Sequence, residues 1–257
     1  MALRLKKLMA VNPESTQFGT KDVTPNQKTD LVLGVFDSVA TRYDIMNDVM
    51  SGGVHRLWKD QFVRDIRPRA DQKILDMAGG TGDIAFRLHR ATQGKADITV
   101  SDINESMLQV GQDRAFDKGI TNINNWVVTD AADLPFEDNS FDIYTIAFGL
   151  RNVTRIDDAL AEAARILKPG GVFYCLEFSH VDNPIVKKFY DVYSDHLIPR
   201  FGQAIANDRD SYQYLVESIR KFPRREALKK RLIDAGFSKA SHKTMTFGVV
   251  AVHEAWV

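Results

Sequence analysis

Short apolar runs alternate with helical patterns through the middle of the chain. The runs predict buried strands at residues 73–77, 97–101, 124–129, 141–148 and 171–178. The clearest helical pattern lies between the last two runs, where apolar residues from Ile156 to Leu167 share one face. Thr154 is placed to cap the start of this helix, and the sequence KPGG at 168–171 is expected to end it. Strands that alternate with helices predict a mostly parallel sheet with helices on both faces.

The two ends of the chain break this alternation in different ways. In residues 1–70, Leu31, Val35, Phe36 and Val39 recur at helical spacing, which predicts an N-terminal extension of two or three helices that caps a substrate site. Residues 71–257 then form the sheet domain, with a helical insertion at about 180–225. The last segment predicts two strands joined by a turn near Gly248, a hairpin that adds one antiparallel strand to the sheet.

Composition and charge argue against several classes of protein. Lys plus Arg and Asp plus Glu both number 34, so the chain lacks the basic excess of a nucleic-acid binder. The only cysteine is Cys175, which rules out an intrachain disulfide and fits a reducing, cytoplasmic location. The apolar runs are shorter than the ~18 residues of a membrane-spanning helix. The basic start of the chain lacks the apolar stretch of a signal peptide, and we interpret it as a frayed tail.

A glycine-rich turn follows the first strand. The stretch LDMAGGTGD at 75–83 contains Gly80-x-Gly82-x-x-Ala85, which satisfies the dinucleotide-binding fingerprint. Asp102 ends the second strand about twenty residues further on, where a ribose-binding acid belongs. This spacing fits a nicotinamide- or flavin-dependent oxidoreductase. A tight strand-to-helix turn with solvated acids is the purely structural alternative.

The carboxylates around the turn favour a different ligand. The pyrophosphate of a dinucleotide lies on such a turn, and Asp76 and Asp83 would repel it. S-adenosylmethionine (SAM) has no phosphate and carries a sulfonium and an ammonium group beside one carboxylate. One opposite charge about 4 Å away is worth roughly 4 kcal/mol before desolvation, at an effective dielectric of ~20. The turn therefore favours SAM, with Asp102 accepting from the ribose hydroxyls.

A third acid follows the third strand. Asp130 lies in TDAADLPFEDNSFD at 129–142 and is expected at the carboxyl edge of the sheet, where ligands bind in open α/β folds. There it can accept a hydrogen bond from the adenine amino group. The capping of a helix is its alternative role.

Several of these motifs together carry a family resemblance. The segments DMAGGTGD, DINESML, DAADLPFEDNSFD, FGLRNV and ILKPGG resemble the class I SAM-dependent methyltransferases. The stretches VFDSVATRYDIMNDVMSGGVHRLWKD, LEFS and LKKRLIDAGF are similar to the ubiquinone/menaquinone biosynthesis C-methyltransferases, from about Phe18 to Val257. The resemblance implies a seven-stranded, mostly parallel Rossmann-like sheet with a reversed final hairpin. It also implies methylation of a ring carbon on a polyprenylated benzoquinol or naphthoquinol.

The resemblance also implies how individual residues bind SAM. Thr81 takes the place of the turn threonine, Asp102 that of the ribose acid, and Asp130 and Ala131 that of an Asn-Ala pair beside the adenine. Ala147 stands where the family often has a serine, so the hydrogen bond of that serine has no side-chain counterpart here. The expected cofactor-binding residues are Asp76, Gly80, Thr81, Gly82, Asp102, Asp130 and Ala131.

Arg151 and Asn152 are the expected catalytic residues. Methyl transfer from sulfonium to carbon is an in-line displacement, so the protein mainly aligns the partners and excludes water. Arg151 follows the fourth strand, where it would stabilise the forming phenolate or polarise a water, and Asn152 would orient the ring oxygen. A salt bridge from Arg151 to Asp83 or another rim acid is the alternative. The six histidines form no ligand cluster with Cys175, so no metal is expected.

A polyprenyl quinol requires an apolar channel and a membrane source. His196 is a candidate base, and its alternative is a purely structural role.

We expect the protein to contact the inner face of the membrane peripherally or to belong to a biosynthetic complex. The sequence leaves open whether it forms a homodimer. The competing functions are methylation of another small apolar phenol and a non-catalytic SAM-binding subunit. Residues that would line the channel or belong to a core are Phe36, Tyr43, Met46, Met50, Trp58, Tyr190, Tyr193, Tyr212 and Tyr214.

Overall fold

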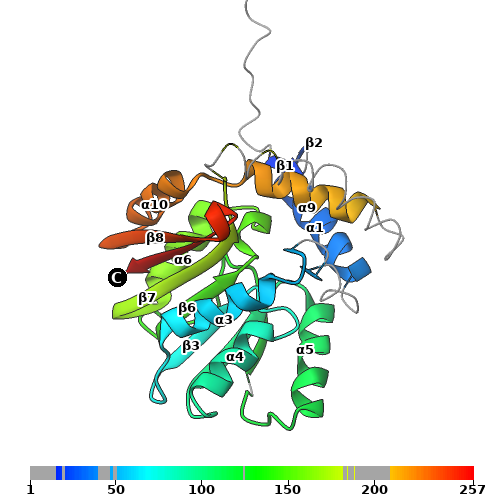
Figure 1. Ribbon diagram of the computed structural model, residues 1–257. Coiled ribbons are helices and arrows are strands. Elements are labelled where there is room, and N and C mark those ends of the chain that lie inside the picture. Colours follow the sequence, from blue (N-terminus) through cyan, green and yellow to red (C-terminus); the bar gives the residue numbers. More distant parts are fainter. Residues whose placement is uncertain are drawn as a thin grey trace, which may run out of the picture.

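A seven-stranded sheet organises the protein, as seen in a computed structural model that describes residues 16–18, 21–39, 47–48, 51–123, 125–181, 184, 188 and 209–257. The strand order is β5-β4-β3-β6-β7-β9-β8, and β9 runs antiparallel to both of its neighbours (Figure 1). This confirms the mostly parallel sheet with a reversed final hairpin. The strands are β3 (Lys73–Met77), β4 (Asp97–Asp102), β5 (Asn125–Val128), β6 (Phe141–Ala147), β7 (Leu167–Phe178), β8 (Lys239–Met245) and β9 (Val250–Trp256).

The strand order creates a crevice at one edge of the sheet. β3 pairs in parallel with β4 on one side and with β6 on the other, so the chain changes direction across the sheet at β3. Helices that follow β3 and β6 therefore leave on opposite faces and open a gap at the carboxyl ends of these strands. β3 reads KILDM, with four of its five residues buried, as a central parallel strand covered on both faces requires.

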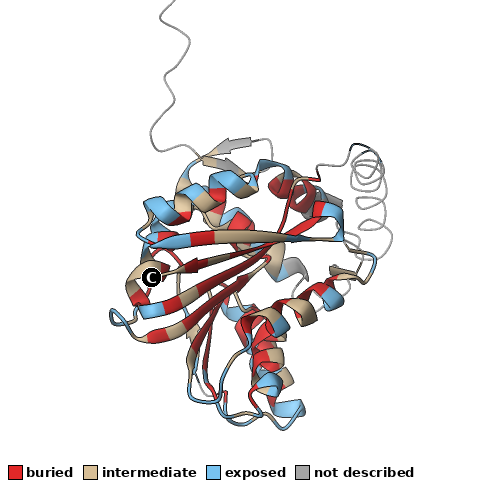
Figure 2. Ribbon diagram, turned by 60° about the vertical axis from the view of Figure 1, so that its left-hand side comes forward, coloured by how far each residue is buried: buried red, intermediate tan, exposed pale blue. Residues whose placement is uncertain are grey.

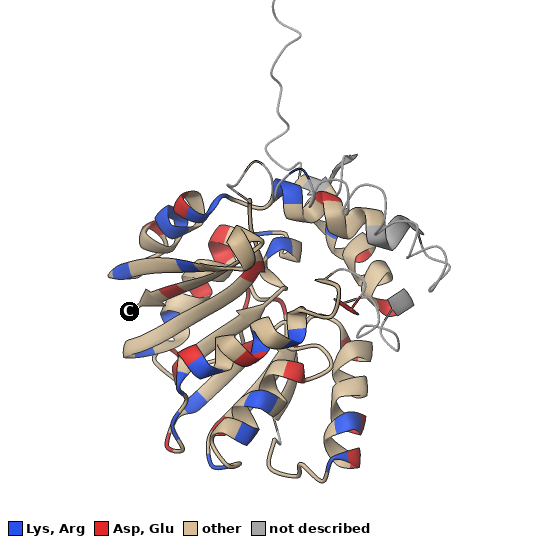
Figure 3. Cartoon of the chain, in the orientation of Figure 1, with Lys and Arg blue, Asp and Glu red and all other residues tan. Residues whose placement is uncertain are grey.

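Helices cover both faces of the sheet through two separate apolar cores. On one face lie α3 (His55–Ile66), α4 (Asp83–Ala91) and α5 (Glu105–Asp117), and on the other lie α6 (Ile156–Ile166) and α10 (Arg225–Asp234). Figure 2 shows the buried residues concentrated along the central strands and on the sheet-facing sides of the helices. Acidic and basic residues are interspersed along α3 and α10 (Figure 3).

One local expectation about α6 was wrong, and β7 begins earlier than expected. Thr154 does not cap α6, because the N-cap residue is Arg155 and no side chain caps this helix end. The hydroxyl of Thr154 instead lies 3.2 Å from that of Thr29. The helix ends at Ile166, just before KPGG, as expected, but KPGG itself lies inside β7, since Leu167 already pairs with Phe141 of β6. The ladder is irregular just after this pair, and Gly170 has a φ of +79°.

The N-terminal extension is helical with a small hairpin that the pattern did not predict. The hairpin consists of β1 (Thr16–Phe18) and β2 (Lys21–Val23), which pair antiparallel and lead into α1 (Pro25–Val39). Phe18 stacks on Tyr214 of α9 (Arg209–Lys221), with ring centroids 4.2 Å apart, so the extension and the later helical segment meet above the sheet.

Several predicted channel residues lie outside the described residues, namely Tyr43, Met46, Met50, Tyr190, Tyr193 and His196, together with the side chain of Tyr212. Within the described part of the chain, no helix is long and apolar enough to cross a membrane.

Candidate active site

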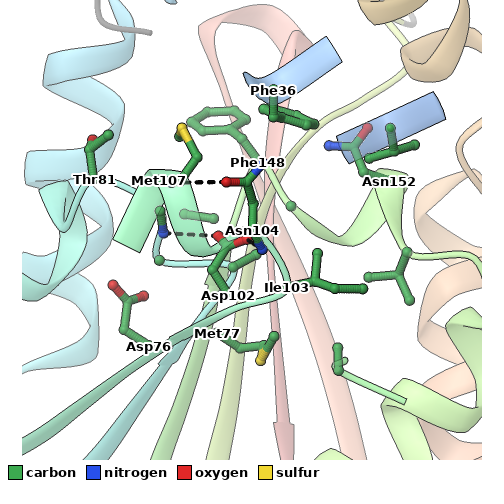
Figure 4. A pocket seen from close by; sticks show the side chains of 18 of the residues that line it. Phe36, Asp76, Met77, Thr81, Asp102, Ile103, Asn104, Met107, Phe148 and Asn152 are labelled. Atoms are coloured by element: carbon green, nitrogen blue, oxygen red, sulfur yellow. Dashed lines mark hydrogen bonds between the residues drawn. The ribbon is translucent and has the colours of Figure 1, made fainter. Parts of the chain in front are cut away.

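A pocket lies at the carboxyl ends of the central strands, at the crevice that the topology predicts. It encloses ≈ 1050 Å³ of empty space, a volume that includes the solvent at its open mouth. Its walls come from the glycine turn after β3, the ends of β4 and β6, the loop after β5, and the inner face of α1. In the view of Figure 4, Asp76 and Asp102 lie on one side of the pocket, and the rings of Phe36 and Phe148 lie on the other.

The glycine turn needs glycine because the backbone there is crowded and partly left-handed. A Cβ at Gly79 would lie 2.6 Å from Val100 Cγ1, and one at Gly82 would lie 2.8 Å from the Phe86 ring. Gly82 also has a φ of +82°, and it immediately precedes the first residue of α4. The turn therefore brings backbone, rather than side chains, against whatever occupies the pocket.

Asp76 is a buried carboxylate with spare hydrogen-bonding capacity. It is 1% exposed, and its Oδ1 accepts a hydrogen bond of 2.8 Å from Thr145 Oγ1. Its Oδ2 is buried and has no partner. Burial raises the pKa of Asp76 to about 7. A buried carboxylate oxygen without a donor is costly, so this atom marks a place where a ligand donor or cation would be stabilised.

Asp102 is held by backbone donors at the end of β4. Its Oδ2 accepts from the amide of Gly80 at 3.0 Å, and its Oδ1 accepts from the amide of Asn104 at 2.9 Å. Burial raises its pKa to about 6, although these hydrogen bonds act in the opposite direction. The carboxylate thus ties the glycine turn to the neighbouring strand and faces the pocket from below (Figure 4).

Asp130 and Ala131 line the pocket from the loop after β5. Asp130 Oδ1 accepts from the amide of Ala132 at 2.9 Å, a local turn of the kind that aspartate favours. Its other oxygen lies 3.5 Å from Arg155 Nη2. The structure therefore brings together all seven predicted cofactor-binding residues at one pocket or its turn, with Gly82 at the start of α4.

The wall opposite the acids is apolar. Phe36, Val32 and Leu33 of α1 and Phe148 after β6 supply most of it. Phe148 has a φ of +56°, an unusual conformation for a bulky residue, and so does Ala78, with a φ of +52°. Strained backbone at the two strand ends that face the pocket is a pattern typical of binding sites.

Trp58 belongs to the core and does not line this pocket. It is buried, its indole Nε1 donates to Thr246 Oγ1 at 2.7 Å, and its ring packs edge-on against Phe178. Of the described residues that were predicted to form a channel, only Phe36 lies in the pocket wall. Tyr214 is also buried, and its hydroxyl donates to Asn152 Oδ1 at 3.1 Å.

Of the two expected catalytic residues, Asn152 lies in the wall of the pocket and Arg151 does not. Asn152 lines the pocket, as expected. Arg151 does not, because its guanidinium turns away and forms an ion pair with Glu177 at the end of β7, with Nη1 3.0 Å from both carboxylate oxygens. Arg151 is 8% exposed, and its ion-pair partner is Glu177 rather than Asp83. Burial raises the pKa of Glu177, and the arginine opposes that shift.

Lys59 is a site residue that the sequence reasoning missed. It comes from α3, is 4% exposed, lines the pocket, and donates to Asp83 Oδ2 at 2.8 Å. Burial alone would raise the pKa of Asp83, but Lys59 and Arg87 hold it below its usual value. The motif HRLWKD contained no signal for this position, because only the packing of α3 turns Lys59 toward the pocket.

The described residues of this site do not form a metal-binding cluster. Within the described ranges, no group of three or more His, Cys, Asp or Glu side chains is placed to hold a metal ion. The pocket instead offers buried carboxylates, backbone amides and an apolar wall, which suit a ligand with cationic, hydroxyl and apolar parts.

A family comparison agrees with this arrangement. Residues 22–257 match the model of the ubiE/COQ5 methyltransferase family. The chain belongs to the ubiE/COQ5 methyltransferase family. Relatives in this family include the ubiquinone/menaquinone biosynthesis C-methyltransferase UbiE of Dinoroseobacter shibae, 54% identical over 95% of this chain and 97% of that protein. The protein of the same name from Brucella abortus is 54% identical over 93% of this chain and 90% of its own length.

Solved structures of other methyltransferases share the fold of this chain. A SAM-dependent methyltransferase of Thermotoga maritima matches with a TM-score of 0.58 at 18% identity, covering 87% of this chain and 98% of that one. A Haemonchus contortus phosphoethanolamine N-methyltransferase 2 in complex with SAM matches with a TM-score of 0.56 at 16% identity, over 77% and 51% of the two chains. At these identities the matches show the methyltransferase fold alone. The protein is thus an enzyme of the ubiE/COQ5 methyltransferase family, which confirms the resemblance carried by its motifs.

Proposed function

We propose that the protein transfers a methyl group from SAM to a ring carbon of a polyprenylated quinol, in the biosynthesis of ubiquinone, menaquinone or both. The names of relatives that share more than half of its residues over nearly the whole chain support the reaction and the pathway. The observation on this chain that supports it best is the unpartnered Asp76 Oδ2, buried in a pocket that also presents Asp102, Asp130 and Asp83.

The residues of the pocket fit SAM. A cationic ligand would stabilise the ionised forms of Asp76 and Asp102, whose pKa values are raised because burial has removed water without supplying a charge. Asp102 keeps lone pairs for the ribose hydroxyls beside those that its two backbone donors use. Asp130 and Ala131 lie on the far side of Asp102, over β5, where an adenine ring would extend.

The residues of this chain carry out binding, orientation and water exclusion. When bound, SAM supplies an activated methyl group with a good leaving group. Asp76, Asp102 and the glycine turn fix one partner, while Phe36 and Phe148 form a dry wall for the ring of the other. Asn152, the catalytic candidate that lines the pocket, is oriented by the hydroxyl of Tyr214 and would hold the ring oxygen of the acceptor.

We assign Arg151 a positioning role within this proposal. Its side chain ties the short 3₁₀ helix Leu150–Asn152 to Glu177, so it fixes the backbone from which Asn152 projects. On this basis Arg151→Ala lowers methyl transfer by on the order of a hundredfold with little change in SAM affinity, because the loss of this tie misplaces Asn152 on the acceptor side.

The acceptor also determines where the enzyme works. Polyprenyl quinols reside in the membrane, so we propose peripheral action from the cytoplasmic side, alone or within a biosynthetic complex, with a homodimer as a further form. No metal is required, since the methyl donor is already activated.

A direct assay separates this proposal from its competitors. Purified protein is incubated with SAM and, in turn, a demethylated polyprenyl benzoquinol, demethylmenaquinol and a simple phenol, and products are measured by mass spectrometry. We expect one added methyl on one or both prenylated quinols. Methylation of the phenol alone would overturn the assignment of the substrate, and binding of SAM without any product would favour a non-catalytic subunit.

A further inference from the structure

The pocket that we propose for SAM is lined by several acidic residues and, among the described residues, by a single basic one, Lys59. Among the described residues that line it, the acids are Asp76, Asp83, Asp102 and Asp130, and Lys59 is the only lysine, arginine or histidine. SAM carries two positive groups, which the acids can match, and one negative carboxylate, which they would repel. A site built only from acids would leave that carboxylate without a partner.

Lys59 is buried, and its ammonium group has defined neighbours at the pocket. The residue is 4% exposed, and its Nζ lies 2.8 Å from Asp83 Oδ2 and 6.0 Å from the centre of the Phe148 ring. An ammonium group has three donor hydrogens, and the hydrogen bond to Asp83 uses one of them. Asp83 does not depend on Lys59 alone, because Arg87 Nε also donates to it at 3.0 Å. The lysine therefore retains donors that can face the pocket.

The order of the strands indicates which part of SAM reaches Lys59. Asp130 follows β5 and Asp102 ends β4, so adenine and ribose would lie over that side of the sheet. The remaining part of SAM, its amino-acid end, then extends across β3 toward β6. Lys59 lies on that side, between the first residue of α4 and Phe148 at the end of β6.

We propose that Lys59 binds the carboxylate of the methionine part of SAM, while Asp76 takes the ammonium group. The two side chains then match the two opposite charges of an amino acid. This inference rests on SAM as the methyl donor, and it adds that the enzyme selects its donor by the carboxylate as well as by the sulfonium.

The test compares SAM with decarboxylated SAM, which keeps the adenosine, the sulfonium and the amine but lacks the carboxylate. Dissociation constants for both compounds are measured by calorimetry on the wild type, Lys59→Gln and Lys59→Arg. Glutamine can still donate to Asp83, which limits damage to the fold. Lys168→Gln is the control, because Lys168 forms an ion pair of similar length with Asp142, 2.9 Å, outside the pocket.

The wild type and Lys168→Gln should bind SAM about tenfold to a hundredfold more tightly than decarboxylated SAM, the effect expected for one charged hydrogen-bonded pair. In Lys59→Gln this preference should disappear or reverse, and Lys59→Arg should keep most of it. Equal affinities of the wild type for the two compounds would overturn the proposal even if no variant folds. An unchanged preference in Lys59→Gln, with methyl transfer lost, would also overturn it, since Lys59 would then act on the acceptor. Failure of the wild type to bind SAM at all would instead overturn the proposed function.

Discussion

The affinity for SAM should depend on pH through Asp76. In the empty pocket burial raises the pKa of Asp76 to about 7, so the carboxyl is largely protonated in mildly acidic solution. A bound ammonium or sulfonium group favours the ionised carboxylate and lowers this pKa. Binding then releases a proton, and affinity is lost as the pH falls below about 7.

The size of the effect follows from the same pKa. At pH 5.5 only about one empty molecule in thirty has Asp76 ionised, whereas at pH 8 most do, so SAM should bind roughly thirtyfold more weakly at the lower pH. This corresponds to about 2 kcal/mol. Asp102, whose pKa burial raises to about 6, adds a smaller effect in the same direction.

Calorimetry at pH 5.5 and pH 8, in buffers with different enthalpies of ionisation, measures both the affinity and the protons released. Asp76→Asn should bind SAM more weakly at pH 8 and should lose most of the pH dependence. Thr145, whose hydroxyl donates to Asp76, provides a further variant, since Thr145→Val removes one donor to the charged form and should shift the dependence to higher pH. A dissociation constant that stays constant from pH 5.5 to pH 8, or a slope that survives in Asp76→Asn, would refute the reasoning.

Three further substitutions test the surroundings of the site. Gly149→Ala places a Cβ in steric conflict with that of Ala78 and should destabilise the fold by about 1–3 kcal/mol, measured by urea unfolding; wild-type stability would contradict the tight contact. Glu177→Gln removes the charge that pairs with buried Arg151 and should cost about 3–5 kcal/mol in the same assay, and a loss below about 1 kcal/mol would mean that the pair is dispensable. Tyr214→Phe should lower kcat by about tenfold at unchanged SAM affinity, and an unchanged kcat would remove this hydroxyl from the orientation of the acceptor.

The acidic side of the pocket, where we propose that SAM binds, could be located from the sequence because its signals are local. The glycine turn, the acid at the end of β4 and the acid after β5 each follow a strand that is recognisable as an apolar run. Parallel strands bring their carboxyl ends to one edge, so residues such as Asp76, Asp102 and Asp130 meet there once the strands are identified.

The remaining parts depend on packing that a pattern does not contain. Trp58 and Lys59 are neighbours on α3, and only the rotation of that helix against α4 and the sheet decides that one enters the core and the other the pocket. Arg151 faces Glu177 because β7 lies beside β6, and the sequence alone left several acids open as partners. The strands of the hairpin β1–β2 have three residues each, too few for an alternating pattern to be recognised.

Quinone profiling tests the central claim most directly. A bacterium whose own quinone C-methyltransferase gene has been deleted is supplied with this chain or with its Asp102→Asn variant, and its lipid-extracted quinones are identified by mass spectrometry. The account predicts that the wild-type chain restores the methylated quinone and that the variant leaves mostly the demethylated precursor. A precursor that persists in cells with folded wild-type protein would contradict it.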